Sequence, residues 1–286
     1  MRVILYVFAG RRANLEVASP FYQRVAAQYP HIEIHLWDLC RNPEDSRYLR
    51  SLATDRIQVR AEFYDRLGRS ARGQTKVWQH YTSPDYRDCV FLKLDDDALF
   101  IETEKLESFG QAAAENPDHV VSAQVINNGS CTRLFPDIWA GYQQLGIPLL
   151  DVHTSAEYAE LSHRWFFQHW RTVINQPAEL TLADTWCSIN AISYTYEMGC
   201  KIAAAIGTRS PDQIADRHYP RRNQRGRPLR HTVGDEGSVN MQNILIHQGF
   251  TVGHLTFGPQ DRAMDDSLLT ELRKNYADIG RQYLEP

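Results

Sequence analysis

Three consecutive carboxylates follow an apolar segment in the first half of the chain. Asp95, Asp96 and Asp97 come directly after the run Cys89–Leu94, which contains one lysine and is typical of a strand buried on both faces. Two unit charges about 4 Å apart repel by about 4 kcal/mol at an effective dielectric of 20, so the cluster needs water, a cation or raised pKa values. A divalent ion that also bridges phosphate oxygens relieves the repulsion directly. One aspartate here would indicate a helix cap, whereas three after a strand favour a metal or nucleotide site.

A second acidic pair and a histidine lie near the C-terminus. Asp235 and Glu236 stand at the start of a predicted helix, where two acids either pair with the helix dipole or present a general base to a cleft. His254 lies at the end of the predicted strand Phe250–Leu255. Its imidazole either makes a structural hydrogen bond or completes a metal site. Neither feature identifies a function by itself.

An arginine-rich segment directly precedes the acid pair. Residues 217–230 contain six arginines and no acid. Glycine and proline in this part of the chain predict a long loop over 207–234. Three interpretations stay open: a solvated connection, a lid over a diphosphate, or a grip on a polyanionic acceptor such as DNA.

The elements that must position these residues alternate between strand and helix in the first half. Strands are predicted over Val3–Phe8, Ile32–Trp37, Cys89–Leu94 and Val120–Ile126, and helices over Phe21–Gln28, Glu44–Leu52, Thr75–Tyr81 and Glu102–Ala114. In the second half, helices are predicted over Ala156–Ile174, Glu197–Ile206, Ser238–His247 and Leu268–Tyr283, and strands over Ser188–Tyr194 and Phe250–Leu255. The alternation predicts an α/β protein with a mainly parallel sheet and helices on both faces.

The composition is that of a globular protein. Of 286 residues, 43% are hydrophobic and 23% charged, which excludes a fibre and wholesale disorder. The net charge of -4 excludes a generally basic nucleic-acid coat, but not a local basic patch. No apolar run approaches the roughly 20 residues of a membrane span, and residues 1–10 predict a buried strand rather than a signal peptide. The five cysteines, without a CxxC pair, predict reduced thiols in a cytoplasmic protein.

The order and spacing of these motifs resemble those of nucleotide-sugar-dependent glycosyltransferases with the GT-A fold. Those enzymes have an Asp-x-Asp motif after a core strand, a later acid pair at a helix start, and a C-terminal histidine. Residues 95–97, 235–236 and 254 fill these places, and the resemblance covers roughly residues 1–257. It implies a GT-A-like, Rossmann-type sheet with an acceptor-side extension. Residues 1–130 would bind the nucleotide sugar, and residues 131–286 of the same domain would bind the acceptor and carry the catalytic groups.

The resemblance also implies a role for each residue of the motifs. Asp97 and His254 would bind a manganese or magnesium ion that bridges the donor diphosphate. Asp95 would contact the ribose or the base, and Asp96 belongs to the same nucleotide-binding triplet. Glu236 would deprotonate the acceptor hydroxyl, which implies inversion at the anomeric carbon. The family's pair is commonly Glu-Asp whereas this chain has Asp-Glu, so Asp235 is the alternative base.

Two further regions are candidates for donor binding. Gly10 would let the backbone of the turn after the first strand approach the nucleotide closely, and Arg11 could hold it. Alternatively, Arg11 and Arg12 are solvated surface charges without a role in binding. Lys76 lies where related enzymes place donor-binding side chains, although a plain surface lysine fits the sequence as well.

Other functions compete with this interpretation. Clustered aspartates after a strand also serve metal-dependent phosphoryl and nucleotidyl transfer. However, the residues around the triplet only partly match a haloacid-dehalogenase-type motif, and Phe8–Arg12 is too poor in glycine for a pyrophosphorylase. A non-catalytic nucleotide- or glycan-binding module is the alternative outside enzymes. The sequence leaves open whether the acceptor is a glycan, a protein or a modified nucleic acid.

Overall fold

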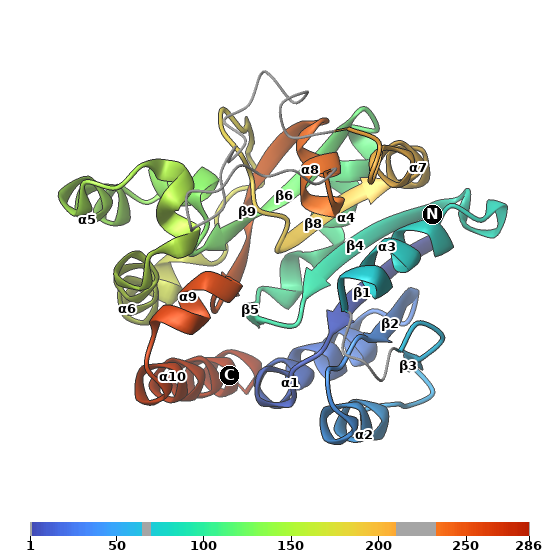
Figure 1. Ribbon diagram of the computed structural model, residues 1–286, viewed down its shortest axis with the longest axis horizontal. Helices are drawn as coiled ribbons and strands as arrows, with labels where there is room; N and C mark the ends of the chain where they lie inside the picture. The colour runs from blue at the N-terminus through green and yellow to red at the C-terminus, as the bar shows by residue number, and fades with distance from the viewer. Residues whose placement is uncertain (1, 65–69, 210–232, 286) are drawn as a thin grey trace.

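The computed structural model describes residues 2–64, 70–209 and 233–285, and the account below concerns these residues. They form a nine-stranded sheet flanked by helices (Figure 1). The strands are β1 Arg2–Ala9, β2 Ile32–Asp38, β3 Ile57–Arg60, β4 Cys89–Asp95, β5 Ala98–Ile101, β6 His119–Ile126, β7 Leu180–Leu182, β8 Ala191–Thr195 and β9 Asn243–His254. The α-helices are α1 Arg12–Gln28, α2 Pro43–Ser51, α3 Ser70–His80, α4 Leu106–Glu115, α5 Pro136–Leu145, α6 Ala156–Val173, α7 Tyr196–Ala205, α8 Asp235–Asn240, α9 Gly258–Ala263 and α10 Asp266–Leu284. Short 3₁₀ helices cover Pro84–Tyr86, Thr103–Lys105, Gly129–Leu134 and Leu149–Thr154.

The sheet is mixed but mostly parallel. Its strand order is β3-β2-β1-β4-β8-β6-β9-β5, with β7 paired to β9. β1 pairs in parallel with β2 and β4, and β2 with β3, while β8 is antiparallel to both β4 and β6. Since β9 is parallel to β6, six of the nine strands in the described residues share one direction, and β5, β7 and β8 oppose it. The predicted α/β class is confirmed.

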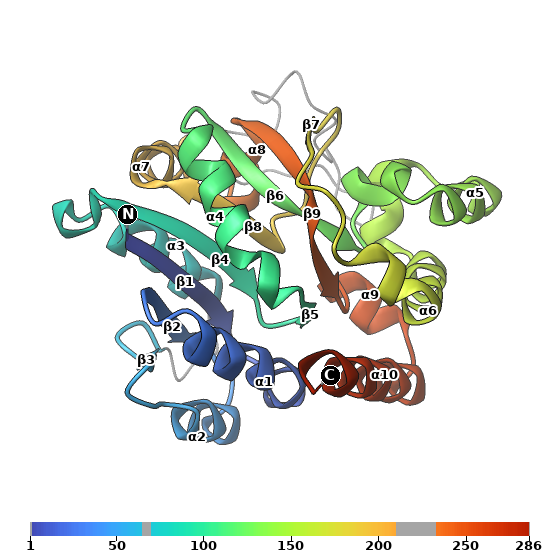
Figure 2. The ribbon, with the colours of Figure 1, turned by 180° about the vertical axis from the view of Figure 1, so that it is seen from behind.

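Helices cover both faces of the sheet. In Figure 2, α4 and α1 lie over one face, and α3 and α7 lie over the other face in Figure 1. The pairing of β4 with β8 joins the first half of the chain to the second within one sheet. No helix within the described ranges is long and apolar enough to cross a membrane. All five cysteines are free thiols, and four of them are buried.

The first helix begins earlier than the sequence predicts. Pro20 lies inside α1, whereas the prediction started the helix at Phe21. Proline removes the N–H that would bond to the carbonyl of Glu16 one turn earlier. Both Pro20 and Glu16 are exposed, so water can satisfy that carbonyl. The proline is therefore tolerated without ending the helix.

The prediction of a helix over Ser238–His247 is wrong. After the short helix α8, the chain enters β9, whose first part pairs in parallel with β6 from His119↔Asn243 to Ala123↔His247. Buried Ile244 and Ile246 have the two-residue spacing of a strand, whereas residues so spaced lie on opposite sides of a helix. Gly249 lies where the register shifts, and a Cβ there would approach two backbone oxygens, Gln176 O and Pro177 O, within 2.8 Å. Gly249 thus allows the close packing of β9 against the backbone of residues 176–178.

The strand order reverses beside β1. The chain leaves β1 through α1 to β2 on one side, and the next central strand, β4, lies on the other side. In open α/β sheets, ligands bind in the crevice outside the carboxyl ends of the strands at such a reversal. The residues that follow β1 and β4, Gly10–Arg11 and Asp96–Asp97, therefore flank the expected ligand position.

Candidate functional site

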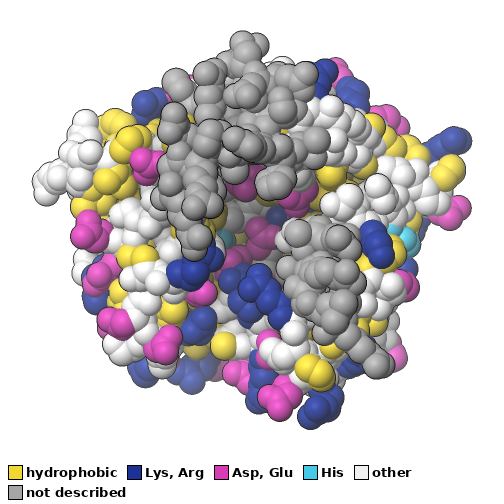
Figure 3. All heavy atoms as spheres, viewed as in Figure 1, with side chains coloured by type: hydrophobic (Ala, Val, Ile, Leu, Met, Phe, Trp, Pro, Cys, Tyr) yellow, Lys and Arg dark blue, Asp and Glu magenta, His cyan; other side chains and the backbone are white. Residues whose placement is uncertain are grey.

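A cavity of about 260 Å³ opens at the carboxyl ends of β1 and β4. In the space-filling view, acidic and basic side chains meet in this hollow (Figure 3). Its lining includes seven of the nine site residues selected from the sequence: Gly10, Arg11, Asp95, Asp96, Asp97, Glu236 and His254. Segments far apart in the chain are thus brought to one place by the sheet.

Asp96 is bound to the turn that follows β1. Its Oδ2 accepts hydrogen bonds from the backbone N–H groups of Gly10 (2.8 Å) and Arg11 (2.7 Å). Its Oδ1 accepts from Arg11 Nε at 3.0 Å and also from Arg11 Nη2. A Cβ on Gly10 would lie 3.3 Å from the carbonyl oxygen of Leu39, so glycine permits this close packing. Both Asp96 oxygens are occupied, and the residue holds the turn in place.

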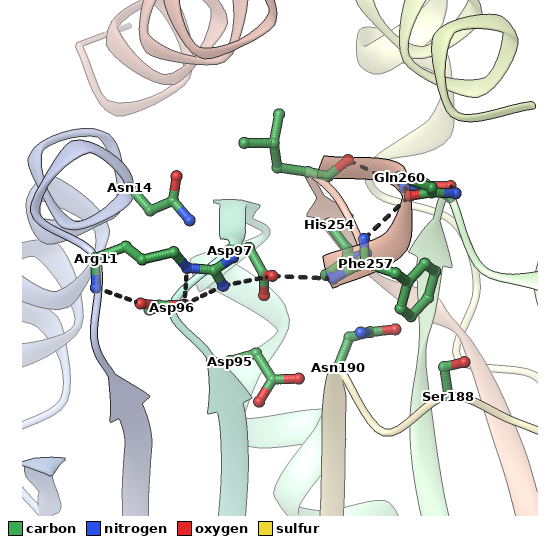
Figure 4. Close-up of polar contacts among 12 residues, drawn as sticks. Arg11, Asn14, Asp95, Asp96, Asp97, Ser188, Asn190, His254, Phe257 and Gln260 are labelled. Carbon is green, nitrogen blue, oxygen red and sulfur yellow. Dashed lines mark hydrogen bonds and ion pairs between the residues drawn. The ribbon is translucent and has the colours of Figure 1, made fainter. Parts of the chain in front are cut away.

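Asp97 lies between a guanidinium and an imidazole (Figure 4). Its Oδ2 is 2.6 Å from Arg11 Nη2 and 3.4 Å from His254 Nε2. Burial alone raises the pKa of the Asp97 carboxyl, but Arg11 and His254 outweigh it and hold the pKa well below its usual range. Asp97 Oδ1 and His254 Nδ1 are buried, and neither has a hydrogen-bond partner among the described residues. The Asp97 carboxyl therefore favours its ionised form, and two buried polar atoms lack a hydrogen-bond partner among the described residues.

Asp95 is held by a buried lysine from its own strand. Lys93 Nζ donates to Asp95 Oδ1 at 2.6 Å and to the carbonyl of Ile189 at 2.7 Å, and it lies 5.0 Å from the ring centroid of Phe8. Lys93 is 1% exposed. Burial nevertheless raises the pKa of Asp95 to about 6, against the lowering effect of Lys93. Each carboxylate of the triplet therefore contacts a positively charged side chain of the protein. These contacts reduce the repulsion among the three carboxylates without a metal ion.

The described residues contain no group of three or more His, Cys, Asp or Glu side chains arranged to hold a metal ion. Two atoms of kinds that bind metals do lie close together, however, because Asp97 Oδ2 and His254 Nε2 are 3.4 Å apart. Atoms bound about 2.1 Å from one ion, at angles of about 90–110°, are separated by about 3.0–3.4 Å. These two atoms can therefore share an ion if Arg11 releases Asp97, with water or ligand oxygens completing the coordination.

Glu236 faces the cavity from the first turn of α8. Burial and the neighbouring charge of Asp235 raise the pKa of Glu236 to about 7, against the opposing effects of Lys93 and of a hydrogen bond from Trp186. No cation among the described residues forms an ion pair with it. Asp235 lies outside the cavity lining, and its Oδ1 accepts a hydrogen bond from the Glu236 N–H at 2.9 Å. Glu236 is the acid of this pair that can exchange a proton with a bound molecule.

Two selected regions lie elsewhere. Lys76 is exposed, its ammonium lies 5.8 Å from the ring centroid of Phe63, and it does not line the cavity. Arg12 pairs with Glu16 on the surface at 2.7 Å, as expected of a solvated charge. The arginines of residues 217–230 lie outside the described residues, so their three interpretations stay predictions.

Several lining residues escaped the sequence analysis, including Arg41, Gln74, Asn190 and Phe257. Arg41 is exposed and forms no ion pair with a described residue. It follows β2 closely, so its place at the carboxyl edge of the sheet was a usable signal. Asn190 precedes the antiparallel β8, and its carbonyl accepts from the Asp95 N–H at 2.9 Å. No local pattern marks a residue that reaches the site from the start of an antiparallel strand.

The chain was compared with protein-family models and with curated proteins. No family model matches it, and no curated protein is significantly similar to it in sequence.

Proposed function

We propose that this protein is a metal-dependent glycosyltransferase, which moves a sugar from a nucleoside-diphosphate donor to an acceptor hydroxyl with inversion. One observation supports the proposal above all. The Asp97 carboxyl, whose pKa is held well below its usual range, lies beside His254, and a carboxyl group with a pKa near 7 lines the same cavity at the strand reversal. The first suits binding of a cation and its anionic ligand, and the second suits proton transfer near neutral pH.

In this proposal the β1–β4 side of the cavity binds the donor. Asp97 and His254 would hold a divalent ion through Oδ2 and Nε2, which are 3.4 Å apart. Such an ion, when bound, adds positive charge at the diphosphate as that group leaves. The guanidinium groups of Arg11 and Arg41, both on the cavity lining, would bind phosphate oxygens. The side chain of Asp95, one-quarter exposed to the cavity, would accept a hydrogen bond from a donor hydroxyl.

Glu236 would act on the acceptor from the opposite side. Its carboxylate accepts the proton of the acceptor hydroxyl while the hydroxyl oxygen forms a bond to the anomeric carbon. The bond from that carbon to the diphosphate oxygen breaks, and its electron pair leaves with the diphosphate. A single displacement of this kind inverts the configuration. Asp235 would be a positioning residue, because it holds the N–H of Glu236.

Donor binding is the first test. Thermal shift and calorimetry with UDP, GDP and dTDP, each with and without Mn²⁺, should find one nucleotide whose stabilisation of the protein requires the metal. Asp97→Asn should abolish the metal-dependent part. Asp118→Asn, which changes an exposed carboxylate paired only at 3.6 Å with Lys201, is the matched control. Absence of binding to all three nucleotides, with or without metal, would contradict the proposal.

The products then separate the competing functions. With the sugar nucleotide of the preferred base, slow release of nucleoside diphosphate and free sugar without acceptor supports sugar transfer. Release of a nucleoside monophosphate would instead indicate nucleotidyl or phosphoryl transfer. Binding without any turnover would indicate a binding module.

A further inference from the structure

The Arg11 guanidinium contacts Asp97 Oδ2, the oxygen atom that would bind a metal ion shared with His254. Arg11 Nη2 is 2.6 Å from Asp97 Oδ2, the same oxygen that faces His254 Nε2 at 3.4 Å (Figure 4). The same guanidinium also contacts Asp96 Oδ1. One guanidinium of the chain therefore contacts both acids beside the candidate metal site.

Asp96 and Asp97 depend on Arg11 to different degrees. Asp96 would keep two backbone hydrogen bonds, from the N–H groups of Gly10 and Arg11, if the guanidinium moved away. Asp97 Oδ2 would keep only its contact with His254. The departure of the guanidinium would therefore leave the turn after β1 intact and free the metal-binding oxygen.

The side chain of Arg11 also has room to move. It is 35% exposed and faces the cavity, whereas the side chains of Asp96 and Asp97 are 5% and 7% exposed. Rotation of the guanidinium into the cavity opens no gap in the apolar core. An incoming diphosphate offers it anionic oxygen atoms, which a guanidinium binds through bidentate hydrogen bonds as it binds carboxylates.

We infer that Arg11 is an internal counterion that excludes a free divalent ion from Asp97 and His254, and that it is released to an anionic diphosphate. While Arg11 contacts Asp97 Oδ2, its positive charge opposes the binding of an added metal ion to that oxygen. With a diphosphate present, Arg11 turns to the phosphate oxygens and Asp97 becomes available. Metal and diphosphate then increase each other's affinity, as linkage requires. The identity of the anion as a diphosphate rests on the proposed function.

The decisive experiment measures Mn²⁺ alone on the nucleotide-free protein. Loss of the free-Mn²⁺ signal in electron paramagnetic resonance gives the affinity. Arg11→Gln should raise this affinity about tenfold or more, because the competing charge is gone. Arg12→Gln removes an equal charge at the next position, where the side chain pairs with Glu16 on the surface, and should change the affinity much less. Equal effects of the two variants would overturn the inference.

Two further measurements keep the inference testable if Arg11→Gln folds poorly. Arg11→Lys retains the charge and should leave the weak binding of Mn²⁺ alone nearly unchanged, and a tenfold gain would count against the inference. In the unchanged protein, the ¹⁵Nε resonance of Arg11, assigned by its absence in Arg11→Lys, should not move with Mg²⁺ alone. It should shift when Mg²⁺ is added with the nucleoside diphosphate that binds. A shift with Mg²⁺ alone would show that the ion displaces Arg11 unaided.

The outcomes also separate this inference from the proposed function. A gain of Mn²⁺ affinity in Arg11→Gln that vanishes in Arg11→Gln/Asp97→Asn supports the counterion role even if no nucleotide binds. Metal-dependent nucleotide binding without any gain in Arg11→Gln would keep the proposed function and reject the counterion.

Discussion

Two acidic clusters border the same cavity and are stabilised in different ways. In the Asp95–Asp97 triplet, Lys93 or Arg11 contacts each carboxylate within 3 Å. Glu236, in contrast, has no ion pair with any described cation, and the nearby charge of Asp235 opposes its ionisation. The pKa of Asp97 is accordingly held well below its usual range, whereas that of Glu236 is raised to about 7.

In the proposed function, this difference assigns cation binding to the triplet and proton transfer to Glu236. A carboxylate that stays ionised at every physiological pH is a dependable ligand for cations but a poor base. A carboxyl group with a pKa near 7 is half protonated at neutral pH and can exchange its proton efficiently. Asp95, with a pKa raised to about 6 despite Lys93, lies between these two cases.

The largest expected effect comes from removing the exchangeable proton site. Glu236→Gln keeps the shape of the side chain, and we expect turnover to fall by about 10²–10⁴, the usual contribution of a positioned general base. Nucleotide affinity should stay unchanged, because the β1–β4 side of the cavity is intact. Steady-state kinetics and calorimetry measure the two quantities. If Asp235→Asn abolishes turnover and Glu236→Gln does not, the base is Asp235.

The pH profile should show the same contrast without a mutation. Glu236 must be ionised to accept a proton, so turnover should rise about tenfold per pH unit below pH 7 and level off above it. The residual activity of Glu236→Gln should lack this rise. A profile that is flat between pH 5.5 and 8 in the unchanged protein contradicts the assignment.

A third test removes a cation from the triplet, so that Asp95, like Glu236, has no ion-pair partner. Lys93→Met removes the buried ammonium and leaves Asp95 without its 2.6 Å partner. We expect a loss of about 1–3 kcal/mol in the free energy of unfolding, less than for a fully buried pair because Asp95 is partly exposed. The loss should shrink as the pH falls towards 5, since protonation removes the unpaired charge. Adding Asp95→Asn should restore part of the stability in denaturant titrations.

The smallest expected effect is on the melting temperature, through the ionisation of Glu236. The pKa of Glu236 is about 7 in the folded protein and near 4.5 in an unfolded chain, so the folded state binds its proton more tightly. The wild type therefore loses stability as the pH rises from 4.5 to 7, and Glu236→Gln does not. At pH 8 the variant should melt about 2–4 °C higher, equivalent to about 1 kcal/mol. Glu197→Gln, at the exposed start of α7, should show no such gain.

The grouping of the cavity-lining residues was more predictable from the sequence than the second half of the fold. An apolar strand followed by three acids fixes both the burial of β4 and the place of the acids at its end. The second part of β9 was predicted as the strand Phe250–Leu255, but a helix was predicted over its first part, although Ile244 and Ile246 have the two-residue spacing of a strand. Its parallel pairing with β6 is decided by residues more than a hundred positions away, which no local pattern contains.

The charge partners within the site were the least predictable part. Lys93 is visible as the single lysine of an apolar strand, but its contact with the Ile189 carbonyl depends on the antiparallel neighbour β8. Arg11 and Arg12 are identical neighbours in sequence. Only the direction of the turn after β1 sends Arg11 to Asp96 and Arg12 to Glu16.

The late position of β9 has a consequence for the protein during its synthesis. His254 is the last residue of β9 and lies beside Asp97, and the next residue, Leu255, donates its N–H to the Asp97 carbonyl at 2.8 Å. Pairings between residues so distant in sequence form slowly, because the intervening loop must close first. While the ribosome is still translating the β9 codons, the nascent chain already carries the acid triplet but lacks the histidine. A chain released before that point would contain every residue of β1 and β4 and still be unable to complete the site.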